Sequence, residues 1–188
     1  MVSRKDIFKY SRRFIGGTPA VYAYYTEDKL KSIDIMTSKD TQFTDVDVHS
    51  TIGLSEIDIN KSLSGKRVGV ELIAVGDKGK ETICNILASV AFEIMDEHDC
   101  YFGKVFSDAI SKYDNGLAMK HAILLSPAFW NQYKQMSSED MIVTWLLLVP
   151  LSDMEKEYVE KFGVDEFEEL LAKQDVDITD INRKSFVI

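Results

Sequence analysis

Residues 45–75 read DVDVHSTIGLSEIDINKSLSGKRVGVELIAV and contain two strand-like runs on either side of a turn-rich connection. In the first run, Val46, Val48 and Ile52 are interleaved with polar residues, which is the pattern of a strand with one solvent-facing side. The second run ends in LIAV, an apolar segment typical of a strand that is covered on both faces. We therefore expect both runs to join one sheet, with the second strand at its centre.

Gly53 interrupts the β-rich segment between these runs and is followed closely by Ser55 and Glu56. Glycine adopts left-handed backbone conformations without a Cβ penalty, so the chain is expected to bend at this point. Two interpretations remain open, a bulge followed by a loop and a loop that contacts a ligand.

Length and composition indicate an ordinary globular protein. The 188 residues are 45% hydrophobic and 28% charged, which suits one compact domain over residues 1–188. The charged N-terminus lacks the apolar core of a secretory signal, and the longest apolar run, residues 141–151, is shorter than the ~20 residues of a membrane span. We expect a cytoplasmic protein without a membrane partner, in which Cys84 and Cys100 are reduced.

The charge is unevenly distributed along the chain. The formal net charge of -9 argues against a nucleic-acid partner, since phosphate binding requires clustered Lys and Arg. Residues 1–17 carry a net charge of +4, whereas residues 150–182 carry -8. An acidic segment of this kind would attract a cationic protein, and the alternative is a solvated helix face.

Hydrophobic periodicity predicts the elements outside the opening stretch. The fold class is α+β, with a mixed central β-sheet, a main buried helix over 82–97 packed against it and a C-terminal helical pair. An amphipathic helix is expected over 3–15, where Gly16-Gly17 ends it. The remaining expected strands are 20–25, 30–36, 121–125 and 141–149, with Pro127 and the following residues 128–130 ending the ladder after 121–125, and residues 101–119 form an irregular connection with one short strand.

The C-terminal pair begins with a capping box. Ser152 and Glu155 have the S-x-x-E spacing in which the two side chains satisfy free amides at a helix start. Met154, Tyr158 and Phe162 are expected to face inward. A second short helix starts near Asp165, and the acidic residues of both helices are expected to point to water or to a partner.

Motifs that carry catalysis are missing from the sequence. It has no G-x-S-x-G, P-loop, H-E-x-x-H or glycine-rich dinucleotide motif. Asp45, Asp47 and His49 form the only tight cluster of metal-capable side chains, and they would share one face of a strand. Because the outer face of a strand is usually simply polar, we predict neither a metal nor a cofactor.

Residues 45–188 resemble the suppressor-of-fused-like family. The segments that carry the resemblance are DVHSTIGLSEI, VELIAV, NILASVAFEIM, LLSPAFW and, above all, WLLLVPLSDMEKEYVEKFGVDEFEELLAKQDVDITDINR. This last segment combines a strand ending in Leu-Val-Pro-Leu, a Glu-rich helix, a glycine, a second short helix and a terminal Asp-x-x-Arg. The chain lacks room for the additional regions of animal members, so transcription-factor binding is not carried over.

The compact bacterial members of this family, including the YqcF-type antitoxins, are similar to immunity proteins that neutralise the C-terminal nuclease domain of a toxin. The resemblance implies that function here, with a basic nuclease domain as partner and no catalytic residues. A non-enzymatic scaffold that binds a peptide by strand addition, and an enzyme with an unrecognised pocket, remain as alternatives. The candidate contacts with the toxin are Glu155, Glu157, Glu160, Glu166 and Glu169.

Overall fold

One mixed sheet forms the centre of the molecule. The computed structural model describes residues 2–127 and 134–186, and within them nine strands form a sheet in the order β1-β2-β3-β5-β9-β7-β6, with β4 beside β5 and β8 beside β9. The strands are β1 (Thr18–Tyr25), β2 (Ser32–Lys39), β3 (Val46–Ile52), β4 (Ser62–Leu63), β5 (Lys66–Asp77), β6 (Val105–Phe106), β7 (Met119–Leu125), β8 (Met136–Ser137) and β9 (Met141–Ser152).

The two longest strands, β5 and β9, lie side by side at the centre. They run parallel from Arg67 opposite Met141 to Ile73 opposite Leu147, and all other neighbours in the sheet are antiparallel. The prediction of a mixed sheet with two central apolar strands is therefore confirmed. The expected hairpin is also confirmed as β1 and β2, with both strands longer than predicted. Residues 128–130, expected to end the ladder, and part of LLSPAFW lie outside the described residues.

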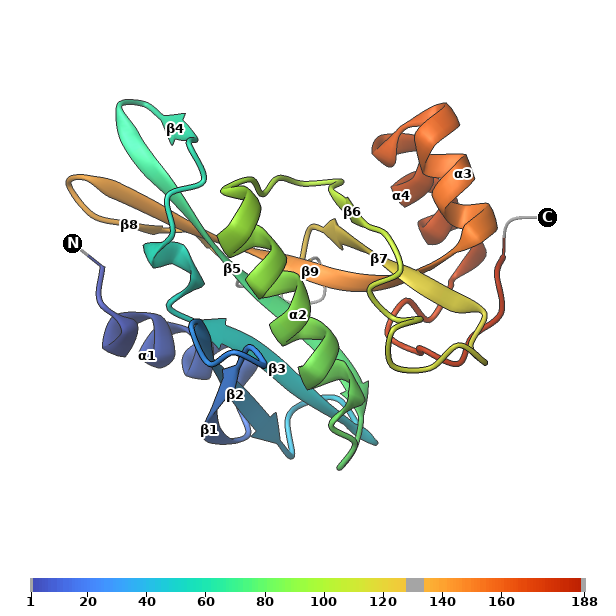
Figure 1. Cartoon of the computed structure of the whole chain (residues 1–188), viewed down its shortest axis with the longest axis horizontal. Coiled ribbons are helices and arrows are strands. Elements are labelled where there is room, and N and C mark those ends of the chain that lie inside the picture. The colour runs from blue at the N-terminus through green and yellow to red at the C-terminus, as the bar shows by residue number, and fades with distance from the viewer. Residues whose placement is uncertain (1, 128–133, 187–188) are drawn as a thin grey trace.

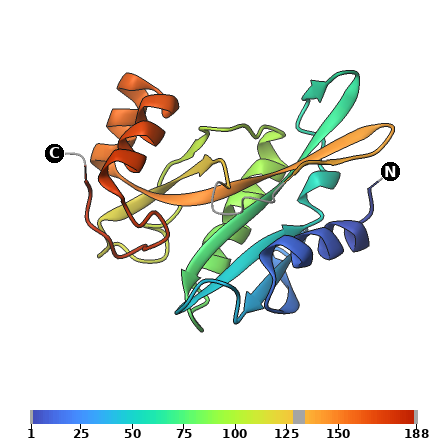
Figure 2. The same ribbon diagram turned by 180° about the vertical axis from the view of Figure 1, so that it is seen from behind.

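Helices cover both faces of the sheet. The predicted buried helix is α2 (Thr82–Glu97), which crosses one face (Figure 1). The opposite face carries α1 (Arg4–Ile15), which begins with a Ser3 capping box and ends at Gly16, where φ is 77° (Figure 2). The C-terminal pair is α3 (Asp153–Phe162) and α4 (Val164–Gln174), which lie at the far end of the molecule from α1 (Figure 1).

The sheet separates two hydrophobic clusters. On one side, α2 buries Ile83, Ile86 and Leu87 against β2, β5 and β9. On the other side, α1 contributes Ile7 and Ile15, and α3 and α4 contribute Val159, Phe167 and Leu171. Because both faces are covered, even strands with alternating polar residues become buried.

β3 shows this effect and corrects one prediction. Its alternating pattern predicted a solvent-facing side, but Asp47, His49 and Thr51 are all buried. The sequence-based prediction was wrong because that side is covered: Cys84, near the start of α2, contacts His49, and Thr51 donates to the buried Glu71. The polar residues that alternate with apolar ones in β3 therefore form a buried polar layer.

Candidate functional site

The start of α3 is fixed by the last residue of β9. Ser152 Oγ accepts a hydrogen bond from the Glu155 amide at 3.2 Å, and Glu155 Oε2 accepts one from the Ser152 amide at 3.1 Å. This is the predicted capping box, and it satisfies amides that would otherwise lack partners at the helix start. As a result, α3 leaves the sheet directly from the end of a central strand.

Glu155 is also the partner of an arginine in the C-terminal tail. Arg183 Nη1 lies 2.6 Å from Oε1 and Nη2 lies 2.8 Å from Oε2, which is a bidentate pair. Arg183 also donates to the Pro150 carbonyl, and the Phe186 amide donates to Glu155. The Glu155 side chain is 0% exposed. The prediction that it points to water or a partner was wrong, because this position faces the sheet and a distant arginine neutralises it.

The other four candidate glutamates are exposed on α3 and α4. Glu160 lies 3.9 Å from Lys156 and Glu169 lies 3.3 Å from Lys173. Among the described residues, neither Glu157 nor Glu166 forms an ion pair, so these two carry the least compensated negative charge. Their role as partner contacts stays a prediction, and Glu157, Glu160, Glu166 and Glu169 are hereafter called the α3–α4 glutamates.

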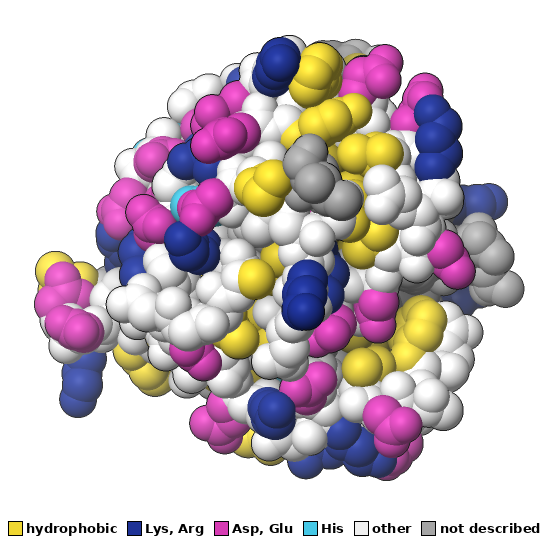
Figure 3. Space-filling model, turned by 90° about the vertical axis from the view of Figure 1, so that its right-hand side faces the viewer, with side chains coloured by type: hydrophobic (Ala, Val, Ile, Leu, Met, Phe, Trp, Pro, Cys, Tyr) yellow, Lys and Arg dark blue, Asp and Glu magenta, His cyan; other side chains and the backbone are white. Residues whose placement is uncertain are grey.

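Exposed apolar side chains accompany the α3–α4 glutamates. Met154 is 45% exposed and Phe162 is 49% exposed, so the prediction that they face inward was wrong. The buried positions of α3 are Glu155 and Val159, and Tyr158 is half-buried with its ring centroid 4.6 Å from that of Phe162. Figure 3 shows this end of the molecule with acidic, basic and apolar side chains interspersed. Such a mixture resembles the surface of a non-obligate interface.

A groove runs along α4 on this side of the molecule. It has a volume of about 520 Å³, and burial raises the pKa of Glu168 at its edge. A cationic group placed beside this carboxyl would lower its pKa again, because an opposite charge favours the ionised form. The groove is lined by Leu125, Ser126, Glu168, Leu171, Ala172, Asp175, Val176 and Ile178.

Asp47 and His49, predicted as part of the only metal-capable cluster, lie in a separate buried polar layer. His49 Nδ1 is 3.0 Å from Thr37 Oγ1 and 3.1 Å from Cys84 Sγ, and Asp47 Oδ2 accepts from the Gly79 amide. Burial lowers the pKa of His49 to about 4 and raises that of the Cys84 thiol. A protonated thiol beside a neutral imidazole is not an activated nucleophile.

The third residue of that cluster does not join the other two in this layer. Asp45 precedes β3 with φ of 61°, and its carbonyl accepts from the Lys78 amide. The described residues contain no group of three His, Cys, Asp or Glu side chains arranged to hold a metal ion. Cys84 and Cys100 are both buried and unbonded to each other.

The loop at Gly53 is tied to a buried carboxylate. Gly53 has φ of 102°, as expected for a bend at glycine, and its amide donates to Glu71 Oε1 at 2.9 Å. Ser55 donates to the same oxygen through its amide and its hydroxyl, while Thr51 and the Leu54 amide donate to Oε2. The loop amides point inward to Glu71, which favours the bulge-and-loop interpretation over a ligand contact.

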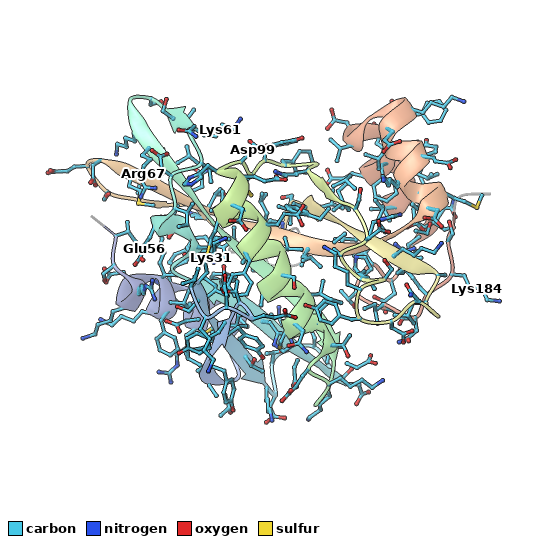
Figure 4. The ribbon with its side chains drawn as sticks, viewed as in Figure 1. Lys31, Glu56, Lys61, Arg67, Asp99 and Lys184 are labelled. Carbon is cyan, nitrogen blue, oxygen red and sulfur yellow. The ribbon has the colours of Figure 1, made fainter. Side chains whose placement is uncertain are left out.

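Arg4, one of the basic residues of α1, forms ion pairs with acidic neighbours. Arg4 Nε and Nη2 pair with Glu56, and Nη1 lies 3.2 Å from Asp34. Figure 4 places Glu56 near α1 and Lys184 at the opposite end of the molecule, where the C-terminal tail passes the α3–α4 pair.

No helix among the described residues has the length and apolar character needed to cross a membrane.

Comparison with known proteins identifies the family. The sequence profile of the Suppressor of fused protein (SUFU) family matches residues 29–184. The chain is also 33% identical over 174 residues to the immunity protein YqcF of Bacillus subtilis (strain 168), covering 92% of this chain and 91% of that protein. The chain therefore belongs to the SUFU family, and the resemblance seen in residues 45–188 is confirmed and extends toward the N-terminus.

Solved structures share the fold at low sequence identity. A SUFU homologue from Neisseria gonorrhoeae FA 1090 has a TM-score of 0.73 at 15% identity, covering 98% of this chain and 97% of that chain. A chain of the Sufu-Fu complex has a TM-score of 0.71 at 13% identity, covering 98% of this chain and 92% of that chain. Drosophila Suppressor of Fused matches with a TM-score of 0.58 at 11% identity over 90% of this chain and 42% of its own length.

Proposed function

We propose that this SUFU-family chain is an immunity protein that acts as one domain in the cytoplasm, where it binds and neutralises a cognate toxin. The observation that carries the proposal is the 33% identity to the immunity protein YqcF over nearly the whole length of both chains. The match covers 92% of this chain and 91% of that protein, so it extends over most of the fold. An activity that depends on the complete fold is therefore a reasonable one to transfer.

The proposed partner is the C-terminal nuclease domain of the toxin, contacted through the α3–α4 glutamates. A nuclease must bind phosphate groups, so its active face is basic, and an acidic surface on the inhibitor would match it. Glu157 and Glu166 are exposed and uncompensated within the described part of the chain, which makes them the strongest candidates. Exposed Met154 and Phe162 would add apolar contact area.

The proposed mechanism is binding without catalysis or a cofactor. The buried layer around Cys84 and His49 lacks an activated thiolate, since the thiol pKa is raised and the imidazole pKa is about 4. Glu71, the other deeply buried acid near a loop, already accepts hydrogen bonds from that loop and from Thr51. Cys84 and His49 line a pocket of about 190 Å³, but the raised thiol pKa and the lowered imidazole pKa leave neither side chain activated as a nucleophile or base.

The test begins with the neighbouring reading frame, which the proposal expects to encode a toxin, and uses the C-terminal domain of that toxin. Wild-type protein should restore growth of cells that express this domain. The double variant Glu157→Lys and Glu166→Lys should slow association on the order of tenfold at low salt, because rim charges act mainly on the association rate. The difference from wild type should shrink at high salt.

A matched control separates surface position from net charge. Glu81→Lys and Glu139→Lys change the total charge by the same amount at exposed positions away from α3 and α4. This control should associate nearly as fast as wild type. If wild-type protein gives no protection, the immunity function is wrong; if protection is normal and both double variants behave alike, only the choice of surface is wrong.

One observation favours the non-enzymatic scaffold as a second candidate. Recognition by strand addition requires an open sheet edge, and β1 provides one.

A further inference from the structure

β1 is an edge strand whose one proline lies near its start, so most of its length is open to pairing. It is the outermost strand of the sheet and runs in register with β2 over all eight residues, Thr18 to Tyr25. Its sequence, TPAVYAYY, contains no charged residue. Natural edges are commonly blocked by lysines, bulges or covering elements. Here Val21 is 45%, Tyr22 55% and Tyr25 61% exposed.

The hydrogen-bonding direction of β1 follows from the turn at its end. The Thr26 amide donates to the Lys31 carbonyl, and this pair continues the register in which Tyr24 lies opposite Ile33. In an antiparallel ladder the backbone groups of successive residues point alternately to the two sides. Even-numbered residues of β1 therefore bond to β2, and the amides and carbonyls of Val21, Ala23 and Tyr25 face the open edge.

Pro19 is also an odd-numbered residue of β1, so its backbone faces the open edge and limits where a partner strand can pair. It has no N–H to donate, and its nitrogen faces the open edge, which is where an edge strand tolerates proline. A partner that pairs with Val21, Ala23 and Tyr25 avoids this gap. The usable edge is therefore short, unbroken and centred on Ala23.

We propose that the occupant of this edge is a second copy of the chain, paired antiparallel through β1 with Ala23 on the two-fold axis. Val21 then lies opposite Tyr25 of the second copy, and Tyr22 lies opposite Tyr24 of the second copy. Val21, Tyr22 and Tyr25 are exposed and Tyr24 is partly buried, so both pairs would bring aromatic and aliphatic side chains of the kind that stabilise neighbouring strands into contact. The small side chain of Ala23 allows the two strands to meet at the axis.

Self-complementarity favours a second copy over an unrelated strand. An isologous contact must match itself, and this one places no charge opposite a like charge within the strand and keeps both prolines outside the central pairs. The β1 edge and the α3–α4 pair lie at different ends of the molecule (Figure 1), so pairing leaves both α3–α4 surfaces open. The inference does not depend on the proposed immunity function.

Cysteine cross-linking tests the register. Ala23→Cys should form an intermolecular disulfide under mild oxidation, since residues facing each other in a bonded antiparallel pair have Cα atoms about 5.5 Å apart. Val21→Cys is the matched control, because it has the same strand face and would lie far from its own copy. The native cysteines are buried and should not interfere. Cross-linking at Val21 but not at Ala23 would overturn the proposed register.

The mass of the protein in solution tests the dimer itself. Light scattering at increasing concentration should show wild-type protein approaching twice the monomer mass. Ala23→Pro removes an amide that faces the open edge, so it should give a folded monomer, whereas Leu30→Lys, at an 82% exposed position outside the pairing, should still dimerise. Wild-type protein that stays monomeric, or an Ala23→Pro variant that is folded and still dimerises, would overturn the proposal.

Discussion

Glu71 and Glu155 are both completely buried, but the molecule accommodates them in different ways. Glu71 accepts hydrogen bonds only from uncharged donors of residues 51–55, and burial raises its pKa despite these bonds. Glu155 instead faces Arg183, a full cation from the C-terminal tail. One carboxylate therefore organises a nearby loop, and the other fastens a distant segment to the start of α3.

Because of this difference, removing a hydrogen-bond partner should cost less stability at Glu71 than at Glu155. Loss of a neutral donor near Glu71 leaves other donors in place, so the damage is limited. Loss of Arg183 leaves a buried charge without its cation, which is far more costly than loss of a surface pair. The same comparison explains why the exposed Glu157 and Glu166 can change without harm to the fold.

The largest effects are expected where the buried pair of Glu155 and Arg183 is broken, as in Arg183→Met. This variant leaves Glu155 buried and unpaired, so the free energy of unfolding measured in urea should fall by about 3–5 kcal/mol. The double variant Arg183→Met with Glu155→Gln should recover much of the loss, because Gln keeps the capping box without a charge. A loss below about 1 kcal/mol in the single variant would contradict a buried ion pair.

A smaller effect is expected for Glu71→Gln. A glutamine side chain has one oxygen and one NH₂ group. In either orientation, the NH₂ group therefore faces N–H or O–H donors that bond to a carboxylate oxygen in the wild-type protein. We expect a loss of about 2–3 kcal/mol in urea unfolding. Ser55→Ala removes only one of the donors to Oε1 and should cost about 1 kcal/mol. Equal losses in the two variants would show that Glu71 is not the centre of this network.

His49 should make stability depend on pH in a defined window. Its pKa is lowered from 6.5 to about 4 in the folded protein, so the unfolded chain takes up a proton first as the pH falls. The stability that depends on neutral His49 is present above pH 6.5 and is lost as the pH falls toward 4. Between pH 7 and pH 5 this lowers the free energy of unfolding by about 2 kcal/mol. Urea unfolding of His49→Gln should show a weaker loss of stability over that window than wild-type protein.

The smallest effect is expected at the exposed glutamates. Glu157→Lys and Glu166→Lys together should change the free energy of unfolding by no more than about 0.5 kcal/mol, as is usual for surface substitutions. Glu155→Lys should unfold the protein, since it places a second cation against Arg183. Thermal unfolding of the three proteins would check this ranking, and a large destabilisation of the double variant would mean that α3 and α4 depend on surface charge.

The periodicity of hydrophobic residues was sufficient to predict an element whose structure depends on burying one apolar face. It predicted α2 with the observed ends, since Ile83, Ile86 and Val90 recur at helical spacing and the helix is buried along that stripe. It failed for Met154 and Phe162, because α3 has only a few apolar residues and its buried stripe runs through Glu155. A polar residue on the inner face of a helix cannot be recognised from hydrophobic spacing.

By itself the sequence determined a set of local choices and the family. The local choices are the helix cap at Ser152, the helix end at Gly16-Gly17, the bend at Gly53 and the apolar strands at the centre. These depend on residues only a few positions apart. The tertiary structure alone decided which polar groups are buried, since Arg183 reaches Glu155 and α2 covers His49 across long stretches of chain. Burial of a polar residue depends on whether a distant partner can replace water, and that partner becomes known only when the chain is folded.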